Sequence, residues 1–582
     1  MTTRSSLPYR RGVRLSRTLR PAALLVASGL LYSIGFVDFD RWYFAWISLV
    51  PLLFALRDVG TWKRALAFSW IMGFVAHLVG YHWVIHLLRE FAHLPVPLAV
   101  LGWLLLAVGQ SASFAAWGLL AWFLRRRAGL PLGAALPIAI MAVEFAFPLL
   151  FPSYMANSQA RMPWVTQIAD LGGVVLVSGL LALVNGAIYE LVEARRRRAC
   201  EEFTSSREAE GGADEKKSVS ARSAAEEIGP ASAGPISSLA RHPLPWKLAA
   251  GALGSLALTV GYSAVRIGQV EARDEAAPKL KTAIVQANVG AGSKHADVDG
   301  GIRRFQRMTD EAMDLPGIGL VVWPESGFNR AVTPRLPNLT GLVAAEVKAP
   351  MILGALRADV SSGKRKIWNS ALALDTGGEI VAHYDKTVLL AFGEYVPGDS
   401  LFPGIYDLLP YTSHFERGAS VEPLPVGPYR LSTDICYEDI LPGFIRSLMG
   451  PVDAEGRRPH AMVNVTNDSW YGPVEPHIHL ALATFRSIEH RRWLVRSTAT
   501  GISAFVDSAG RIRKQSGFET EEVLVEDVPM IDGGATVYGV LGDWPGWLAL
   551  VASGAALAWP GALSRARRRD PEAEDLPDGR AA

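Results

Sequence analysis

The stretch YRLSTDICYEDILPGF (residues 429–444) contains Cys436, one of only two cysteines among 582 residues. Its first half alternates apolar and polar side chains, a pattern typical of a β-strand, and this pattern ends at the cysteine. A helix-like segment follows, with Glu438 and Asp439 close behind the cysteine. A lone cysteine is usually a small buried hydrophobic residue, so a chemical role for Cys436 has to be argued from its surroundings.

Residues 281–530 contain further strand-like runs, interleaved with amphipathic segments. The clearest predicted strands are KTAIVQANV (281–289), GLVVWPES (319–326), APMILGALR (349–357), NSALALD (369–375), RLSTDIC (430–436) and AMVNVTND (461–468). Helices are predicted at 300–314 and 478–492. Repeated alternation of strands and helices predicts an α/β domain with a buried sheet.

The remainder of the chain is strongly apolar, since half of all residues are hydrophobic and 17 are tryptophan. A helix of about 20 apolar residues crosses the hydrocarbon core of a bilayer, which is roughly 30 Å thick. Such segments occur at 22–37, 42–57, 65–88, 96–124, 131–151, 171–193, 246–264 and 545–562. The sequence therefore predicts a multi-pass α-helical membrane bundle, with six helices in residues 1–193, a seventh at 246–264 and an eighth at 545–562.

Basic residues are concentrated in every second loop between these segments. They lie before the first segment, at Lys63 and Arg64, at 125–127, at 195–198, and after the last segment at 565–569. The positive-inside rule places these loops and both termini in the cytoplasm. The α/β domain is then predicted to be extracytoplasmic.

Two charged segments lie outside the predicted helices. Residues 194–245 are rich in charge, Ser and Ala, and have too little apolar surface to fold alone, so we predict a disordered cytoplasmic linker there. Cys200 lies in this stretch and is expected to be a solvated thiol. Residues 563–582 are predicted to be a cytoplasmic tail. The net charge is only +2 and no nucleic-acid-binding motif is present, so nucleic acid is not an expected partner.

Three polar residues lie in or near the predicted strand ends of the α/β domain. Glu325 closes GLVVWPES, Lys386 lies in AHYDKTVLLAFGEYVP (382–397), and Cys436 closes RLSTDIC. Taken singly, they could be a carboxylate at a helix N-terminus, a surface lysine and a buried small side chain. Together with the surrounding sequence motifs WPES, FGEYVP, CYE and NVTNDSWYG, they resemble the Glu–Lys–Cys triad of the nitrilase, or carbon–nitrogen hydrolase, superfamily. This resemblance covers about residues 281–530 and implies an αββα sandwich.

The chemistry of these residue types agrees with that resemblance. The thiolate is the nucleophilic form of cysteine, and a cysteine that enters a helix N-terminus is expected to gain from the helix dipole. Glu325 can take the thiol proton as a general base. The ammonium group of Lys386 can stabilise the oxyanion of a tetrahedral intermediate.

The order of the segments, several spans followed by this domain and one last span, resembles the apolipoprotein N-acyltransferase family. HFERG (414–418), TNDSWYG (466–472) and VEFAFPLLFPSYMANSQ (143–159) add to the likeness. The resemblance implies a membrane phospholipid, typically phosphatidylethanolamine, as acyl donor. It implies as acceptor the α-amino group of the N-terminal diacylglyceryl-cysteine of a bacterial apolipoprotein. It also implies a Cys436 thioester and a catalytic domain on the periplasmic side of the inner membrane.

The same resemblance gives roles to neighbouring residues. Glu394 is expected to orient Lys386 or to assist proton transfer, while Tyr437 and Glu438 are expected to shape the pocket. Trp470 and Tyr471 are either an apolar wall or lipid-facing loop, or ordinary core aromatics. The chain departs from the family pattern at 288–295 and 497–501, which concerns the acceptor pocket and the lipid preference and leaves the triad intact.

No cofactor is expected. His477 and His479 are two residues apart and lack sequence neighbours at metal-ligand spacing, so a structural role is predicted for them. One alternative function is a membrane-tethered amidase or nitrilase that uses water as acceptor, although it should not need seven preceding spans. The other is a catalytically silent scaffold or transport component. The intact triad argues against it, and the ionisable residues in the predicted spans do not form an ion pathway; they are His77, His82, His86 and Glu144.

Overall fold

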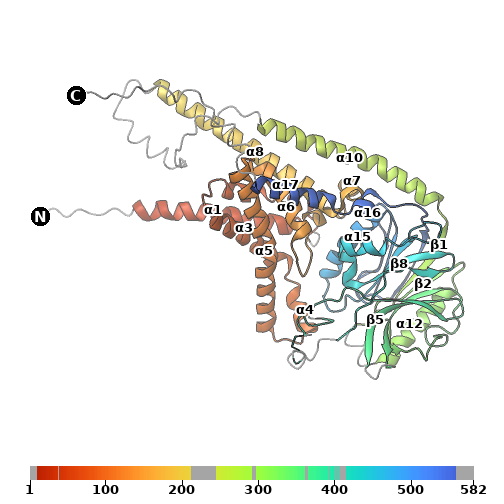
Figure 1. The fold of residues 1–582 in the computed structure, drawn as a ribbon. Helices are drawn as coiled ribbons and strands as arrows, with labels where there is room; N and C mark the ends of the chain where they lie inside the picture. The colour runs from red at the N-terminus through yellow and green to blue at the C-terminus, as the bar shows by residue number, and fades with distance from the viewer. Residues whose placement is uncertain are drawn as a thin grey trace, which may run out of the picture.

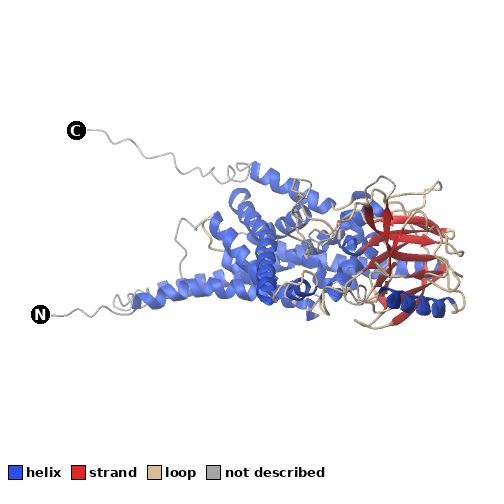
Figure 2. Ribbon diagram, turned by 90° about the horizontal axis from the view of Figure 1, so that it is seen from below, coloured by secondary structure: helices blue, strands red, loops and turns tan. Residues whose placement is uncertain are grey.

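The computed structural model describes residues 9–36, 39–210, 244–290, 297–360, 365–391, 393–399, 401–402, 404 and 414–558. A helical bundle occupies one end of the molecule and an α/β part the other (Figure 1). In Figure 2 the strands lie at one end of the molecule, and most of the helices lie toward the opposite end. The last helix, α17 (Trp544–Ala558), returns from the α/β part to the bundle, where it packs on α6 (Leu132–Ala146).

The bundle is assembled from helices of very different lengths. Besides α6 and α17 they are α1 (Tyr9–Ile34), η2 (Trp42–Trp46), α2 (Val50–Leu56), α3 (Trp62–Gly80), α4 (Val84–Glu90), α5 (Val96–Ala128), η3 (Met155–Gln159), α7 (Pro163–Thr166), α8 (Ala169–Glu210) and α10 (Leu244–Ala276). Leu52, Met72, Phe114 and Leu136 belong to one shared apolar core. Each of the eight predicted membrane segments contains helix in this structure.

Only some of these helices are long and apolar enough to cross a membrane. Within the described residues they are Val96–Ala128, Ala169–Phe203 and Pro245–Ala276, and the α3–α4 pair, bent by 55°, can count as a fourth. Four other apolar helices have 10–17 residues: Leu19–Ile34, Trp42–Leu56, Leu132–Ala146 and Trp544–Ala558. The bundle is thus compatible with a membrane, and the number of eight spans stays a prediction.

The first part of the predicted linker is not irregular, because α8 continues as far as Glu210. Arginine, alanine and glutamate favour helix in this stretch, and Arg197 pairs with Glu193 one turn earlier, at 2.9 Å. The prediction of disorder from residue 194 is therefore wrong for this part. Residues 211–243 lie outside the described residues.

The α/β part is a sandwich of two mixed sheets. One has seven strands, ordered β13-β1-β2-β4-β5-β6 with β3 beside β4, and the other has six, ordered β12-β11-β10-β9-β8-β7. The strands of the first sheet are β1 (Lys279–Gln286), β2 (Leu320–Val322), β3 (Phe328–Val332), β4 (Met351–Asp359), β5 (Lys366–Leu374), β6 (Ile380–Asp385) and β13 (Glu522–Pro529). Those of the second are β7 (Leu424–Val426), β8 (Tyr429–Ile435), β9 (Ala461–Thr466), β10 (Leu494–Thr498), β11 (Ala504–Val506) and β12 (Ile512–Gln515).

Helices complete the layers of this sandwich. Ile284, Val322, Ile435 and Val463 belong to one core shared by the two sheets. Helix α12 (Val298–Met313) covers the first sheet, where Phe305 is part of a second core. The short α14 (Pro442–Leu448) and the longer α15 (Glu475–His490) pack against the second sheet. The predicted αββα arrangement is therefore observed.

Helix α15 joins the sandwich to the bundle. Leu480 and Ala483 pack into the core of the sandwich, whereas Phe485 and Ile488 pack with residues of α8. A helix that is buried on all sides is hydrophobic on more than one face. Figure 1 shows α15 between the strands and the bundle helices.

An ionic cluster lies at the end of α15 and fixes the two parts to each other. The guanidinium of Arg491, which is 1% exposed, donates from Nε to Oδ2 of Asp170 at 2.9 Å and from Nη1 to Oε1 of Gln167 at 2.5 Å. Tyr262 and Arg266 of α10 donate to the same carboxylate at 2.7 and 2.9 Å. We call these five residues the interdomain clasp. It holds the first turn of α8, the middle of α10 and the end of α15 together.

Candidate active site

The three predicted catalytic residues are brought together from both sheets. Glu325 follows β2, Lys386 follows β6 and Cys436 follows β8. All three are buried, and Nζ of Lys386 lies 3.9 Å from Oε1 of Glu325. The charges of Glu325 and Lys386 both act on the thiol of Cys436. Glu325 and Cys436, which are 111 positions apart in sequence, thus share one electrostatic environment.

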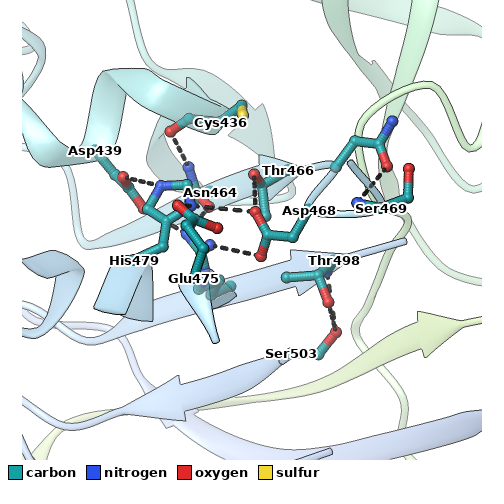
Figure 3. Close-up of polar contacts among 12 residues, drawn as sticks. Cys436, Asp439, Asn464, Thr466, Asp468, Ser469, Glu475, His479, Thr498 and Ser503 are labelled. Atoms are coloured by element: carbon teal, nitrogen blue, oxygen red, sulfur yellow. Dashed lines mark hydrogen bonds and ion pairs between the residues drawn. The ribbon is translucent and has the colours of Figure 1, made fainter. Parts of the chain in front are cut away.

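Cys436 occupies a special backbone position. It begins the short 3₁₀ helix η5 (Cys436–Ile440) with a φ of 53°, in the left-handed region that few residues other than glycine adopt. Residues held in such a conformation cluster at active sites, where the surroundings over-determine it. The side-chain amide of Asn464 donates to the carbonyl oxygen of Cys436 at 3.4 Å (Figure 3).

The predicted helix-dipole activation of this cysteine is wrong. A five-residue 3₁₀ helix supplies little dipole, and burial together with the charge of Glu325 raises the pKa of the Cys436 thiol well above its usual range, although Lys386 opposes them. Burial and the charge of Glu325 thus favour the protonated thiol form of Cys436 in the folded protein.

Lys386 is held in its charged form by carboxylates. Its Nζ donates to Glu394 at 2.9 Å, and Glu394 is fixed in turn by the backbone N–H of Leu390 at 2.8 Å. Burial acts to lower the pKa of Lys386, but the charges of Glu394 and Glu325 outweigh it and leave that pKa raised. The structure thus places Glu394 where it can orient Lys386, and that role stays a prediction.

Asn369 of β5 links the two carboxylates on either side of Lys386. Its Nδ2 atom donates to Glu325 at 2.6 Å and to Glu394 at 3.0 Å. The amide thereby fixes the carboxylate of Glu325 beside that of Glu394. The sequence alone did not single out Asn369, because its only distinguishing feature is that it is a single amide within an apolar strand.

Glu438 lies behind the nucleophile and is fully buried. It accepts four hydrogen bonds of 2.8–2.9 Å, from the hydroxyl of Tyr384 and from the N–H groups of Ile435, Thr387 and Val388. These groups flank Lys386 and Cys436, so Glu438 fixes both segments. Burial raises the pKa of Glu438 to about 7, against the opposing effects of Lys386 and the donors. Glu438 therefore positions the two residues rather than lining the pocket.

A pocket connects Cys436 to the helical bundle. Its space, counted together with the open solvent at its mouth, is about 780 Å³, and its lining includes Tyr32, His77, Phe151, Tyr437 and Leu482 as well as Cys436. Tyr32 and His77 belong to α1 and α3, so bundle helices form one wall. The pocket is largely apolar, because most of its lining side chains are aromatic or aliphatic.

The aromatic residues near the nucleophile contact the bundle. The hydroxyl of Tyr437 donates to the carbonyl of Leu150 at 2.7 Å. Tyr471 lines the pocket, with its ring centroid 5.7 Å from that of Trp83, and Trp470 packs edge-on against Phe91 at 5.1 Å. Tyr437 and Tyr471 thus form part of the pocket wall, as the sequence suggested for them.

Four charged residues form a buried cluster beside the pocket (Figure 3 shows three of them by label). His479 contacts Asp439 at 2.8 Å and Asp468 at 3.1 Å, and Arg496 contacts the same two carboxylates at 2.5 and 3.1 Å. Burial and Arg496 act to lower the pKa of His479, but Asp439 and Asp468 raise it to about 10. We call Asp439, Asp468, His479 and Arg496 the charge cluster.

The charge cluster is not suited to a metal. Asp468, Glu475 and His479 offer ligand atoms within 4.8 Å of one another. Both ring nitrogens of His479 face carboxylates, however, and its raised pKa makes the ring an imidazolium with no lone pair to offer. This arrangement gives His479 a structural role, as expected for it.

The two parts of the chain match two family models. Residues 281–538 match the model described as carbon–nitrogen hydrolase, and residues 28–187 match the apolipoprotein N-acyltransferase N-terminal domain. The sandwich thus matches the carbon–nitrogen hydrolase model, and the helical bundle matches the model of the apolipoprotein N-acyltransferase N-terminal domain.

Similar proteins extend over nearly the whole chain. Apolipoprotein N-acyltransferase of Geobacter metallireducens is 27% identical over 550 residues, which cover 93% of this chain and 95% of that protein. The enzyme of the same name from Pseudomonas aeruginosa PAO1 is 28% identical over 561 residues, or 91% and 94% of the two chains. A solved structure, Saccharomyces cerevisiae Nit3 of the nitrilase superfamily, aligns at 19% identity with a TM-score of 0.32, covering 45% of this chain and 93% of Nit3. The chain is thus similar to the apolipoprotein N-acyltransferases over nearly its whole length, and its two parts match the two family models.

Proposed function

We propose that this protein transfers an acyl chain from a membrane phospholipid to the α-amino group of the diacylglyceryl-cysteine at the N-terminus of a bacterial apolipoprotein, through a thioester on Cys436. The observation that carries the proposal is the apolar pocket, which is lined by residues of the bundle helices and also by Cys436. Each methylene buried in such a pocket stabilises a bound chain by about 0.8 kcal/mol. A donor chain can therefore enter from the bundle while its ester carbonyl lies at the thiol.

In the first step Glu325 takes the proton of Cys436 as the sulfur attacks the ester carbonyl. The ammonium of Lys386 stabilises the oxyanion that forms. The carbon–oxygen bond then breaks, and Glu325 returns the proton to the leaving lysophospholipid oxygen. The raised pKa of Cys436 fits this order, because the thiol keeps its proton until the base is engaged.

In the second step the acceptor amine attacks the thioester carbonyl. Lys386 again stabilises the oxyanion, and Glu325 moves a proton from the amine nitrogen to the departing sulfur. The two lipids thus never have to meet in one transition state. The resulting partners are a phospholipid donor and a diacylglyceryl-modified apolipoprotein. The proposed location is the bacterial inner membrane, with the sandwich on the periplasmic side.

The test uses the purified protein with phosphatidylethanolamine and a synthetic diacylated lipopeptide, followed by mass spectrometry. A triacylated peptide is the expected product. Free fatty acid without triacylated peptide would instead support the alternative, a membrane-tethered amidase or nitrilase that uses water.

Variants of the triad test the mechanism. Phospholipid alone should load a hydroxylamine-labile acyl group onto the wild type and onto Cys200→Ser, whose cysteine is exposed on α8. Cys436→Ala should load none. Lys386→Ala and Glu325→Ala should slow loading about 10²–10⁴-fold each, the usual range for oxyanion and acid–base contributions. Triacylation at the normal rate by Cys436→Ala would overturn the triad.

A further inference from the structure

One carboxyl group in the pocket is not used by the mechanism above. Glu475, the first residue of α15, lines the pocket together with Cys436. Its Oε1 lies 3.7 Å from Nδ1 of His479. Its Oε2 is buried and has no hydrogen-bond partner among the residues that the structure describes. A buried carboxyl oxygen without a partner is costly, so a ligand that supplies a donor would be favoured there.

The charges around Glu475 show which kind of ligand fits. The charge cluster is balanced, since His479 and Arg496 carry two positive charges and Asp439 and Asp468 two negative ones. An ionised Glu475, 3.7 Å from Nδ1 of His479, would add a fifth charge and leave the group with a net negative charge. Burial is the main reason that the pKa of Glu475 rises to about 8; Asp468 adds to the rise, and His479 opposes it. A cation entering the pocket would balance this carboxylate.

We propose that Glu475 binds a primary ammonium group in the pocket, namely the α-ammonium of the acceptor, and removes one proton from it before the amine attacks the Cys436 thioester. This inference rests on the proposed function and adds a residue to its second step. An ammonium ion has no lone pair and cannot attack, so one proton has to leave before the carbon–nitrogen bond forms.

The protons and bonds of this step balance. The ammonium N–H bond breaks and its proton joins a carboxylate oxygen of Glu475, which leaves a neutral amine. The amine nitrogen bonds to the thioester carbon, and Glu325 carries a second proton from that nitrogen to the sulfur as the carbon–sulfur bond breaks. Glu475 releases its proton to water after the product leaves. An α-amino group has an ordinary pKa of about 8. Burial raises the pKa of Glu475, which makes its carboxylate a stronger base toward an ammonium group.

A second source of a primary ammonium is the head group of a phosphatidylethanolamine donor, which would act in the first step. The experiment therefore separates the two half-reactions in the full-length protein. Acyl loading is measured with phosphatidylethanolamine or phosphatidylglycerol and no acceptor. Loss of the preformed thioester is then measured after addition of the diacylated lipopeptide.

Glu475→Gln keeps the shape of the side chain and removes its basicity. We expect loading from both donors to stay within about 2-fold of the wild type, and transfer to the lipopeptide to slow about 10²-fold or more. Glu475→Asp should recover part of the transfer rate, because it restores a carboxylate. Glu311→Gln, a change at an exposed ion pair on α12, should leave both half-reactions unchanged.

Three results would overturn the inference. Slower loading from phosphatidylethanolamine alone would assign the ammonium to the donor head group. Equal slowing of loading and transfer, without rescue by Glu475→Asp, would indicate a purely structural role. Unchanged transfer in Glu475→Gln would mean that Glu475 has no part in the step. The wild type tests the proposed function separately. If the wild type loads and transfers the acyl chain, the proposed function stands whatever Glu475→Gln does. If the wild type does neither, the proposed function itself is refuted.

Discussion

Near Cys436, individual buried side chains are held in place by ion pairs. His479 is 4% exposed and lies between two carboxylates. The pKa of His479 is raised from 6.5 to about 10 because Asp439 and Asp468 outweigh burial and Arg496. The folded protein therefore binds this proton more tightly than the unfolded chain does. The resulting stabilisation is fully present below pH 6.5 and is lost as the pH rises toward 10.

The pH dependence of one variant checks this charge state. His479→Gln leaves the two carboxylates of the charge cluster with Arg496 alone, and breaking a buried ion pair typically costs about 3–5 kcal/mol. We expect a loss of that order at pH 6 and a distinctly smaller loss at pH 10, measured by urea unfolding in detergent. His383→Gln, at a side chain that is 46% exposed, should show little change at either pH. An equal loss for His479→Gln at both pH values would mean that His479 is neutral.

The sequence pointed to the three candidate catalytic residues more readily than to the residues that contact them. Glu325, Lys386 and Cys436 lie beside predicted strands within words that resemble a known family. Asn369 gave no such signal, because its partners Glu325 and Glu394 are 44 and 25 residues away in sequence. Contacts between the ends of separate strands and loops are set by tertiary packing, which local periodicity does not contain.

At the level of elements, the long apolar strands and the buried helices were predictable. The predicted strands correspond to β1, β2, β4, β5, β8 and β9, and the predicted helices to α12 and α15. Shorter or more polar strands were missed, among them β12, whose sequence IRKQ is mostly exposed. Such a strand is specified by pairing with its neighbour, and its own composition resembles a loop.

A backbone break in α8 lies against the segment that leads into α17. Gly172 and Gly173 depart from helical geometry, and Gly173 has a φ of 74°. A Cβ atom on Gly173 would lie 2.7 Å from Oδ1 of Asp543 and 2.7 Å from the ring of Tyr538. Both of these residues lie just before α17, so the break leaves room for this segment to pack against α8.

We expect Gly173→Ala to lower the free energy of unfolding by about 1–3 kcal/mol, because the left-handed backbone and the close contacts both oppose a side chain. The matched control is Gly254→Ala in α10, where nothing lies within 4 Å of the added Cβ. That change should be neutral or stabilise the helix by up to about 1 kcal/mol. Thermal unfolding in detergent measures both. Equal effects of the two substitutions would contradict the role of Gly173.

Across the whole molecule, the interdomain clasp and α15 set the sandwich against the bundle, so the pocket is shared by both parts. This arrangement could not be derived from the sequence, because the clasp joins Gln167 and Asp170 to Arg491, more than 300 positions apart. The sequence did contain the alternation of basic loops, which predicts the side of the membrane on which the sandwich lies.

Reporter fusions test that orientation. A reporter inserted near residue 220 should read cytoplasmic, and one inserted near residue 360 should read extracytoplasmic, because an odd number of spans is predicted to separate them. The measurement is the activity of a reporter that works on only one side of the membrane, such as alkaline phosphatase, in whole cells. A cytoplasmic signal at residue 360 would mean that the number of spans is wrong by an odd count.

The protonated state of Cys436 has a consequence for the durability of the protein. Compartments outside the cytoplasm are oxidising, and the thiolate form of cysteine is the one that peroxides and alkylating agents attack first. A thiol that is 7% exposed and keeps its proton at rest offers such agents a poor target. On the extracytoplasmic side that the topology prediction assigns to the sandwich, the nucleophile would persist between turnovers without a reducing system to restore it.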